Sequence, residues 1–251
     1  MIQARADNPG ATASRYECKY LVAPKQAEAI RKFAQAFVAP DPYAANLEGY
    51  RYSICSLYLD SSDLSLYRQT VEGTKNRFKL RVRTYGDDAL DPVFFEVKRR
   101  MNGVVIKSRS KTSRDRALEY LMRRRSGHGG LEEFANLSRL TSARPSLRVR
   151  YVREAYESPV DRVRVTFDTE LQHSITTSPN ISHNGPGWAR TPIDGVILEL
   201  KFTDQFPSWV RELIDRFQLQ RTSIAKYVMS VDEASAGGGL ERALRQSPRL
   251  G

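Results

Sequence analysis

The stretch FKLRVRTY, residues 78–85, places cationic side chains at every second position. Lys79, Arg81, Arg83 and Tyr85 fall on one side, and they alternate with Phe78, Leu80, Val82 and Thr84. Because a β-strand has a side-chain period of two, one face of this strand is expected to be apolar and the other a row of positive charge. Guanidinium and ammonium groups are donors suited to phosphate oxygens. A single strand with this pattern is also typical of an ordinary sheet with one face in solvent, so the pattern indicates a phosphate-binding surface only if other strands repeat it.

The same division of charged and apolar positions recurs in segments 92–100, 103–111, 161–171 and 195–202. Their charged or polar alternate positions are Glu96, Lys98, Arg100, Lys107, Arg109, Arg162, Arg164, Thr166, Asp168, Glu199 and Lys201. The segment 15–22 agrees, since Glu17 and Lys19 also fall on one face. The sequence therefore indicates several strands that share one cationic face with a few carboxylates on it.

Short strand-like segments dominate the chain, and helix-like segments lie between them. The predicted strands are 15–22, 50–60, 76–85, 92–100, 103–111, 146–156, 161–171 and 195–202, and the predicted helices are 23–37, 61–73, 112–125, 130–140 and 207–218. Hairpin-linked strands with helices grouped between them predict an α+β protein with an eight-stranded antiparallel β-sheet that can close into a barrel.

The predicted helices are amphipathic and need an apolar surface to pack against. We therefore expect them on the outside, over the apolar strand faces, so that the charged faces line an open tunnel. Two like charges ~4 Å apart repel by about 4 kcal/mol at an effective dielectric near 20, so such a lining favours an anionic occupant. A linear chain of phosphates fits it, and Glu199 above all is suited to a divalent cation bridging protein and phosphate.

The composition agrees with a soluble globular protein that binds a polyanion. The chain has 251 residues, 40% of them hydrophobic, and a formal charge of +11. No segment has the length or apolarity of a membrane span or a secretory signal, so we expect a cytoplasmic protein. Cys18 and Cys55 lack a metal-binding spacing and are expected to be reduced and structural. Residues 1–14 and 233–251 are predicted to be disordered tails around a body of residues 15–232.

The runs YECKYLV, KLRVRTY, FEVKRR, IKSR, YVREAY, RVRVTFDTEL, LELKF and SIAKY, in this order, resemble the VTC domain. This is the polyphosphate polymerase domain of the vacuolar transporter chaperone complex and its bacterial relatives, and the resemblance covers about residues 15–232. The family is one of the triphosphate tunnel metalloenzymes, a CYTH-like superfamily, and its resemblance implies an eight-stranded antiparallel tunnel. The SPX domain and membrane helices of the eukaryotic complex have no counterpart in this sequence, so a stand-alone bacterial type is expected.

The resemblance also implies roles for individual residues. The implied phosphate ligands are Lys19, Arg81, Arg83, Lys98, Lys107, Arg153, Arg164 and Lys226, with Tyr151 as the phosphate-contacting tyrosine. Glu199 corresponds to the metal-binding glutamate, and Glu17 and Glu96 are additional metal candidates. Strand parity alone adds Arg109 and Lys201. The expected cofactor is Mn²⁺ or Mg²⁺.

The expected activity is metal-dependent transfer of the γ-phosphate of ATP to a growing inorganic polyphosphate chain. Phosphoryl transfer depends mainly on positioning and charge stabilisation, so a nucleophilic side chain is not required. One alternative is an inorganic triphosphatase in the same tunnel. The ExExK motif of related triphosphatases is altered here, because Arg15 replaces its first carboxylate, and this disfavours a hydrolase. A second alternative is a non-catalytic module for polyanions or RNA, although no nucleic-acid partner is expected, because the alternating face carries mainly cations and few aromatic rings.

Overall fold

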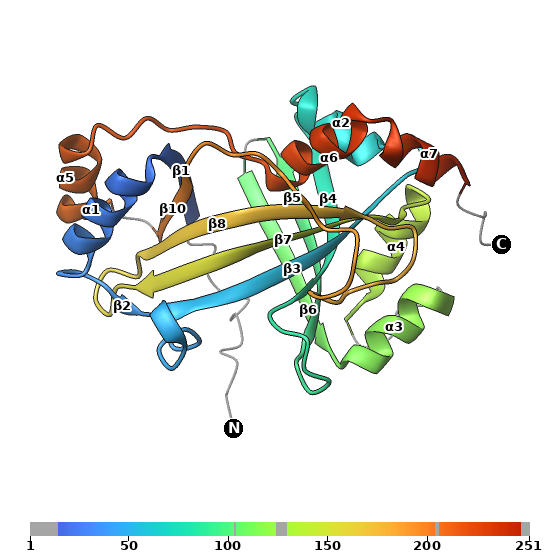
Figure 1. Cartoon of the computed structure of the whole chain (residues 1–251), viewed down its shortest axis with the longest axis horizontal. Coiled ribbons are helices and arrows are strands. Elements are labelled where there is room, and N and C mark those ends of the chain that lie inside the picture. Colours follow the sequence, from blue (N-terminus) through green and yellow to red (C-terminus); the bar gives the residue numbers. More distant parts are fainter. Residues whose placement is uncertain (1–14, 103, 124–129, 204–205, 247–251) are drawn as a thin grey trace. The chain divides into compact units, whose positions relative to one another are not determined.

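The computed structural model describes residues 15–102, 104–123, 130–203 and 206–246 (Figure 1). The chain divides into two compact units. The first unit comprises residues 1–50, 154–167 and 194–224, and the second comprises residues 51–153, 168–193 and 225–251.

The described elements follow one another along the chain as alternating strands and helices. The first unit contains β1 (Arg15–Val22), α1 (Pro24–Ala34), β2 (Ala39–Pro40), a 3₁₀ turn (Glu48–Tyr50), β10 (Val196–Thr203) and α5 (Ser208–Arg216). The second contains β3 (Arg51–Asp60), α2 (Ser65–Val71), β4 (Arg77–Thr84), β5 (Val93–Met101), β6 (Val104–Thr112), α3 (Arg114–Arg123), α4 (Glu132–Leu140), β9 (Ala189–Arg190), α6 (Lys226–Ala236) and α7 (Gly239–Gln246). The strands β7 (Arg144–Glu157) and β8 (Arg164–Ile175) contribute residues to both units.

All eight predicted strands are present and hydrogen-bond in the order β1-β10-β8-β7-β3-β4-β5-β6. The pairs β1–β10, β3–β4, β4–β5 and β5–β6 are antiparallel. Two strands of two residues each were not predicted: β2 pairs with β7, and β9 pairs with β8. The predicted α+β class, with an eight-stranded antiparallel sheet and helices packed on its apolar side, is confirmed.

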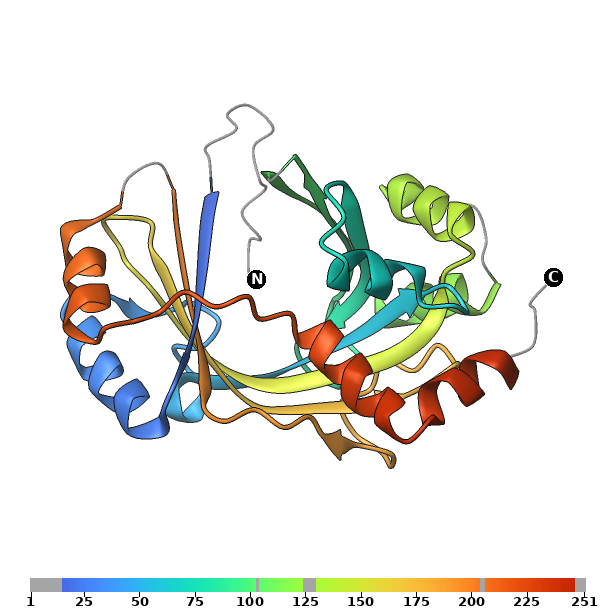
Figure 2. The same ribbon diagram turned by 90° about the horizontal axis from the view of Figure 1, so that it is seen from above.

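In the first unit, the helices α1 and α5 cover the apolar side of the strands. The two helices lie side by side in Figures 1 and 2. Ile30 of α1 and Leu213 of α5 are fully buried in one core with Leu198 and Leu200 of β10. The residues that alternate with these leucines, Glu199 among them, therefore lie on the opposite, charged side of the strand.

The second unit repeats this arrangement with different helices. Leu80 and Val82 of β4 pack in a core with Leu121 of α3 and Phe134 of α4. Phe95 of β5 joins the same core and makes an edge-on contact with Phe134 at a centroid distance of 4.9 Å. In each unit the helices thus cover the apolar strand face, as the sequence pattern predicted.

The prediction of a disordered tail over residues 233–251 is wrong for residues 233–246, and residues 247–251 lie outside the described residues. Residues 233–246 are not a disordered tail, because α6 continues to Ala236 and α7 spans Gly239–Gln246 (Figure 2). Leu240 and Leu244 are spaced one helical turn apart and are both buried, which gives α7 an apolar face to pack. The predicted tail of residues 1–14 lies outside the described residues.

Two further expectations concern the described part of the chain. Within it, none of the helices has the length and apolarity needed to cross a membrane. Both cysteines are free: Cys55 is buried and Cys18 is partly buried. Burial raises the pKa of the Cys55 thiol to about 12, which agrees with a reduced structural role.

Candidate functional site

The strands β3 to β6 bring the predicted cations of the second unit into register. Arg81 lies directly opposite Glu96, which in turn lies opposite Arg109. Two residues further along the same face, Lys79, Lys98 and Lys107 form a row across β4, β5 and β6. Residues directly opposite on neighbouring strands project from the same face, so these side chains share one charged face.

Four cationic side chains converge on the Glu96 carboxylate. Arg81 donates through Nε to Oε2 at 2.7 Å, and its NH2 nitrogen lies 2.6 Å from the same oxygen. Lys107 Nζ and Arg109 Nε lie 2.8 and 3.0 Å from Oε1, and Arg83 NH1 lies 3.8 Å from Oε2. The Glu96 side chain is fully buried. We call these five residues the Glu96 cluster.

The electrostatics of the Glu96 cluster follow from burial and from its excess of positive charge. Burial by itself raises the pKa of the Glu96 carboxyl, but the charges of Arg81 and Arg83 outweigh burial and hold that pKa well below its usual range. Burial also lowers the pKa of the Lys107 ammonium to about 8, with Glu96 opposing this shift and Arg81 adding to it. A further anion near Lys107 would therefore relieve an existing electrostatic cost.

Aromatic residues besides the predicted Tyr85 share this charged face, and these were not predicted to lie there. Tyr58 of β3 lies opposite Arg81, whose NH1 donates to the Tyr58 hydroxyl at 3.4 Å. Burial alone raises the pKa of the Tyr58 phenol, but Arg81 and Arg83 outweigh it and lower that pKa to about 8. Phe94 precedes Glu96 by two positions and lies opposite Arg83. Its parity with Glu96 was the available signal for placing it there.

A second cluster forms around Asp168, a residue of the alternating row that was not assigned a role. Arg153 donates from Nε and NH2 to the two carboxylate oxygens of Asp168 at 2.6 and 2.7 Å. Lys226 Nζ lies 2.7 Å from Oδ2, and it also lies 4.7 Å from the centroid of the Tyr151 ring. Three predicted phosphate ligands, Tyr151, Arg153 and Lys226, are thus brought together. With Asp168 they form the Asp168 cluster.

The position of Lys226 depends on the start of helix α6. Its neighbour Tyr227 is buried, stacks on Tyr58 at a centroid distance of 4.4 Å, and donates a hydrogen bond to Asp60 at 2.8 Å. Asp60 also accepts hydrogen bonds from the backbone N–H groups of Leu66 and other residues at the start of α2. One buried carboxylate therefore fixes both α2 and α6 relative to β3.

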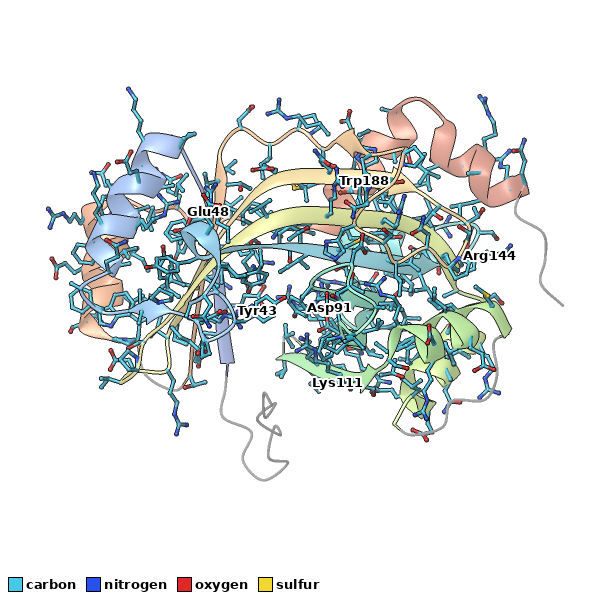
Figure 3. The ribbon with its side chains drawn as sticks, turned by 60° about the horizontal axis from the view of Figure 1, so that its bottom comes forward. Tyr43, Glu48, Asp91, Lys111, Arg144 and Trp188 are labelled. Atoms are coloured by element: carbon cyan, nitrogen blue, oxygen red, sulfur yellow. The ribbon has the colours of Figure 1, made fainter. Side chains whose placement is uncertain are left out.

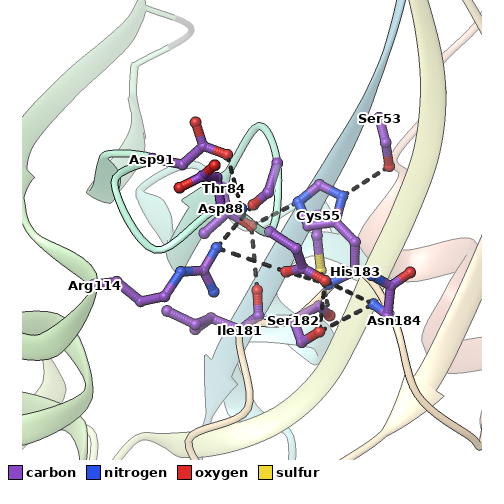
Figure 4. Close-up of polar contacts among 12 residues, drawn as sticks. Ser53, Cys55, Thr84, Asp88, Asp91, Arg114, Ile181, Ser182, His183 and Asn184 are labelled. Carbon is purple, nitrogen blue, oxygen red and sulfur yellow. Dashed lines mark hydrogen bonds and ion pairs between the residues drawn. The ribbon is translucent and has the colours of Figure 1, made fainter.

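A polar network centred on His183 includes Thr84, the last residue of β4 (Figure 4). The His183 ring is hydrogen-bonded to Thr84 Oγ1 at 2.9 Å and to Ser53 Oγ at 2.8 Å. The backbone N–H of His183 donates to the Asp87 carboxylate at 2.9 Å. Thr84 immediately precedes Tyr85, so this network restrains the chain next to Tyr85.

The remaining predicted site residues belong to the first unit. Glu17 and Lys201 are cross-strand partners, as are Lys19 and Glu199, so all four lie on one face of β1 and β10. Lys19 Nζ lies 2.9 Å from Glu17 Oε1, and Lys201 Nζ lies 2.6 Å from Glu199 Oε1. Arg164 of β8 binds the buried Asp41 at 2.6 Å.

The carboxylates of the two units differ in their suitability for a divalent cation. Glu96 already contacts four cations, so we interpret it as an internal counter-ion. Glu17 and Glu199 are diagonal neighbours on β1 and β10, a relation that places the two residues about 7–8 Å apart and their Cβ atoms somewhat closer. Among the described residues, no three His, Cys, Asp or Glu side chains are grouped closely enough to hold a metal. Mg²⁺ commonly binds through one or two carboxylates plus substrate phosphates, and Glu17 with Glu199 fits that requirement.

The chemistry available to the charged faces is the binding and orientation of phosphate groups. Arginine presents forked donors and lysine a compact charge, and both are held in place here by buried carboxylates. Phosphoryl transfer needs such positioning and charge stabilisation more than it needs a nucleophilic side chain.

The model of the VTC domain family matches residues 14–234. Subunit 4 of the vacuolar transporter chaperone complex of Schizosaccharomyces pombe is 26% identical over 250 residues, covering 80% of this chain and 34% of that protein. The chain thus spans about a third of the length of this curated relative.

Two solved structures are similar over most of their own length. A protein of Bacillus halodurans, provisionally described as an adenylate cyclase, has a TM-score of 0.49 and 12% identity, covering 84% of this chain and 95% of that one. A protein of Pyrococcus horikoshii has a TM-score of 0.46 and 12% identity, covering 87% of this chain and 98% of that one.

Proposed function

This chain belongs to the VTC domain family, and from that premise we propose that it is a polyphosphate polymerase that uses ATP. The observation that carries the proposal is the Glu96 cluster, in which Arg81, Arg83, Lys107 and Arg109 converge on one buried anion. An array of this kind, with more positive charge than its single carboxylate can neutralise, is suited to the oxygens of a triphosphate.

In the proposed reaction, a terminal oxygen of polyphosphate attacks the γ-phosphorus of ATP in line with the leaving group. A new P–O bond forms, the bond from the γ-phosphorus to the β–γ bridging oxygen breaks, and ADP leaves with that electron pair. The attacking oxygen is already anionic, so no side chain has to remove a proton from it. Arg81 and Arg83 would orient the triphosphate and stabilise the charge on its equatorial oxygens.

A polymerase is favoured over a triphosphatase because the cationic face extends beyond the Glu96 cluster. The lysine row of Lys79, Lys98 and Lys107 continues along β4–β6, and the Asp168 cluster adds Arg153 and Lys226. A second anionic segment held there would be a growing phosphate chain. Its fixed terminal oxygen would compete with water through proximity.

The proposal includes a divalent cation, Mn²⁺ or Mg²⁺, held by Glu199 together with Glu17. Such a cation would neutralise charge on phosphate oxygens. Lys19 and Lys201 now pair with these carboxylates. When the carboxylates bind the cation, the two lysines would contact phosphate instead.

Purified protein incubated with ATP and Mn²⁺ should produce ADP and a ladder of long polyphosphate on a gel. Arg83→Gln should abolish the ladder, because Arg83 is buried on the charged face. Arg99→Gln is the matched control: Arg99 lies on the other face of β5, where it pairs with Glu133 of α4 at 2.7 Å, and this variant should retain the ladder.

The two alternatives give different products. Stoichiometric release of orthophosphate without a ladder would identify a triphosphatase. Absence of both products would leave a polyanion-binding module, and competition by RNA against tripolyphosphate would then test a nucleic-acid partner.

A further inference from the structure

The two ends of the charged face of the second unit differ in chemistry. At one end, the only side chains in register across β4, β5 and β6 at the level of Lys79 are two more lysines, Lys98 and Lys107. At the other end, one ring stands in the row between two cations, because Phe94 lies between Arg83 and Lys111, and a second ring, Tyr85, immediately follows the last residue of β4. Lys111, labelled in Figure 3, lies on this face of β6. The two ends of this face therefore differ: three lysines form the row at Lys79, whereas aromatic rings lie at the end near Phe94 and Tyr85.

The rings at this end form a connected group. Tyr85 meets Phe94 edge-on at a centroid distance of 5.7 Å, and Tyr52 lies 6.1 Å from Tyr85. The guanidinium of Arg109 lies 3.8 Å from the centroid of Phe94 and 5.5 Å from that of Tyr85. Tyr85 and Phe94 are only partly buried, so part of each ring remains accessible.

We propose that this group, Tyr52, Tyr85 and Phe94 with Arg109, is the binding site for the purine base of the nucleotide. The inference rests on the proposed function, because it assigns a binding site to the base of the ATP molecule that the polymerase would use. Phosphate gains little from an aromatic ring, whereas bases stack on rings and on arginine planes without requiring a particular sequence context. A purine can extend the existing stack by lying against Arg109 or Tyr85.

The site fixes the orientation of the substrate along the strands. With the base at Tyr85 and Phe94, the triphosphate lies across Arg83 and then Arg81. The growing chain then lies toward Lys79 and Lys98, about 13 Å from the level of Phe94, since four residues of a strand span that length. The network of His183 with Thr84 and Ser53 holds the aromatic end in place before the nucleotide binds.

Two ligands separate the base from the phosphates: the imido analogue of ATP and inorganic tripolyphosphate. Calorimetric titration should show that Phe94→Leu and Tyr85→Leu weaken nucleotide binding roughly 5- to 150-fold, the range expected for loss of one base stack. Both variants should bind tripolyphosphate as the wild type does. Tyr85→Phe keeps the ring and should retain nucleotide affinity, and Tyr67→Leu on α2 serves as a control for loss of a tyrosine elsewhere in the same unit.

A second measurement uses only the wild-type chain, so it does not depend on the folding of a variant. Ethenoadenosine triphosphate should lose fluorescence on binding through stacking, and excess tripolyphosphate should restore it. Equal loss of affinity for nucleotide and tripolyphosphate in the leucine variants, or no change in ethenoadenosine fluorescence on binding, would overturn the base site. A base site that behaves as expected in a protein that makes no polyphosphate would instead overturn the polymerase assignment alone.

Discussion

Replacing the charge at the centre of the Glu96 cluster should destabilise the fold and make it depend on an added anion. Glu96→Gln leaves Arg81, Arg83, Lys107 and Arg109 facing one another without the carboxylate that now neutralises them. Removal of one partner from a buried ion pair costs about 3–5 kcal/mol. In a chain of this size each kcal/mol lowers the melting temperature by about 2–4 °C, so we expect a decrease of roughly 6–20 °C.

The assay is thermal unfolding with and without tripolyphosphate. Because the anion can replace the missing carboxylate, Glu96→Gln should gain more stability from tripolyphosphate than the wild type, which gains about 2.7 kcal/mol at 100 times Kd. Glu133→Gln is the matched control, since Glu133 pairs with Arg99 in a half-exposed ion pair worth about 0–1 kcal/mol. If Glu96→Gln melts at the temperature of Glu133→Gln, the Glu96 carboxylate is not the counter-ion described above.

Three further outcomes follow from the same structure. Glu199→Gln should raise the Mn²⁺ concentration needed for half-maximal ladder formation at least about tenfold, with tripolyphosphate affinity retained; an unchanged metal requirement would remove Glu199 from the metal site. Lys226→Ala should shorten the product chains more than it weakens nucleotide binding, and gel analysis beside calorimetry distinguishes the two effects. Burial lowers the pKa of His183 below its ordinary 6.5, so the unfolded chain binds more protons near pH 6 and stability should fall as pH decreases through that range. His183→Gln should reduce this slope in denaturant titrations at pH 7.5 and 5.5, leaving the share due to His173, whose pKa is lowered in the same direction.

The strands and their faces could be predicted because a period-two pattern depends only on local sequence. The alternation around Leu80 and Leu198 separates core residues from charged ones, and the structure places both leucines in cores covered by helices. The same alternation in segment 103–111 predicts that Arg109 lies on the charged face, and the structure places it opposite Glu96, which lies opposite Arg81. Strand geometry alone determines which residues share a face, so these faces can be predicted without knowledge of the fold.

The partners within the site could not be predicted, because they depend on distances between strands. Asp168 stands in the alternating row like any other polar residue, and only the pairing with Arg153 and Lys226 shows that it organises a cluster. The parity of Phe94 with Glu96 places its ring on the charged face, but its contacts with Tyr85 and Arg109 depend on the spacing between strands. Helix α7 was missed because its two buried leucines lie in a segment rich in Gly and Arg.

The two clusters of the second unit differ in how much of the chain they require. Every member of the Glu96 cluster lies between Arg81 and Arg109, on three strands joined by consecutive hairpins. The Asp168 cluster closes only when Lys226 arrives, and its helix is anchored through Tyr227 to Asp60, 167 positions earlier. During synthesis on a ribosome, the first cluster can therefore assemble before α6 and α7 are translated, whereas the second must wait until Lys226 has been synthesised. A nascent chain would acquire affinity for a short phosphate anion well before it could retain a long one.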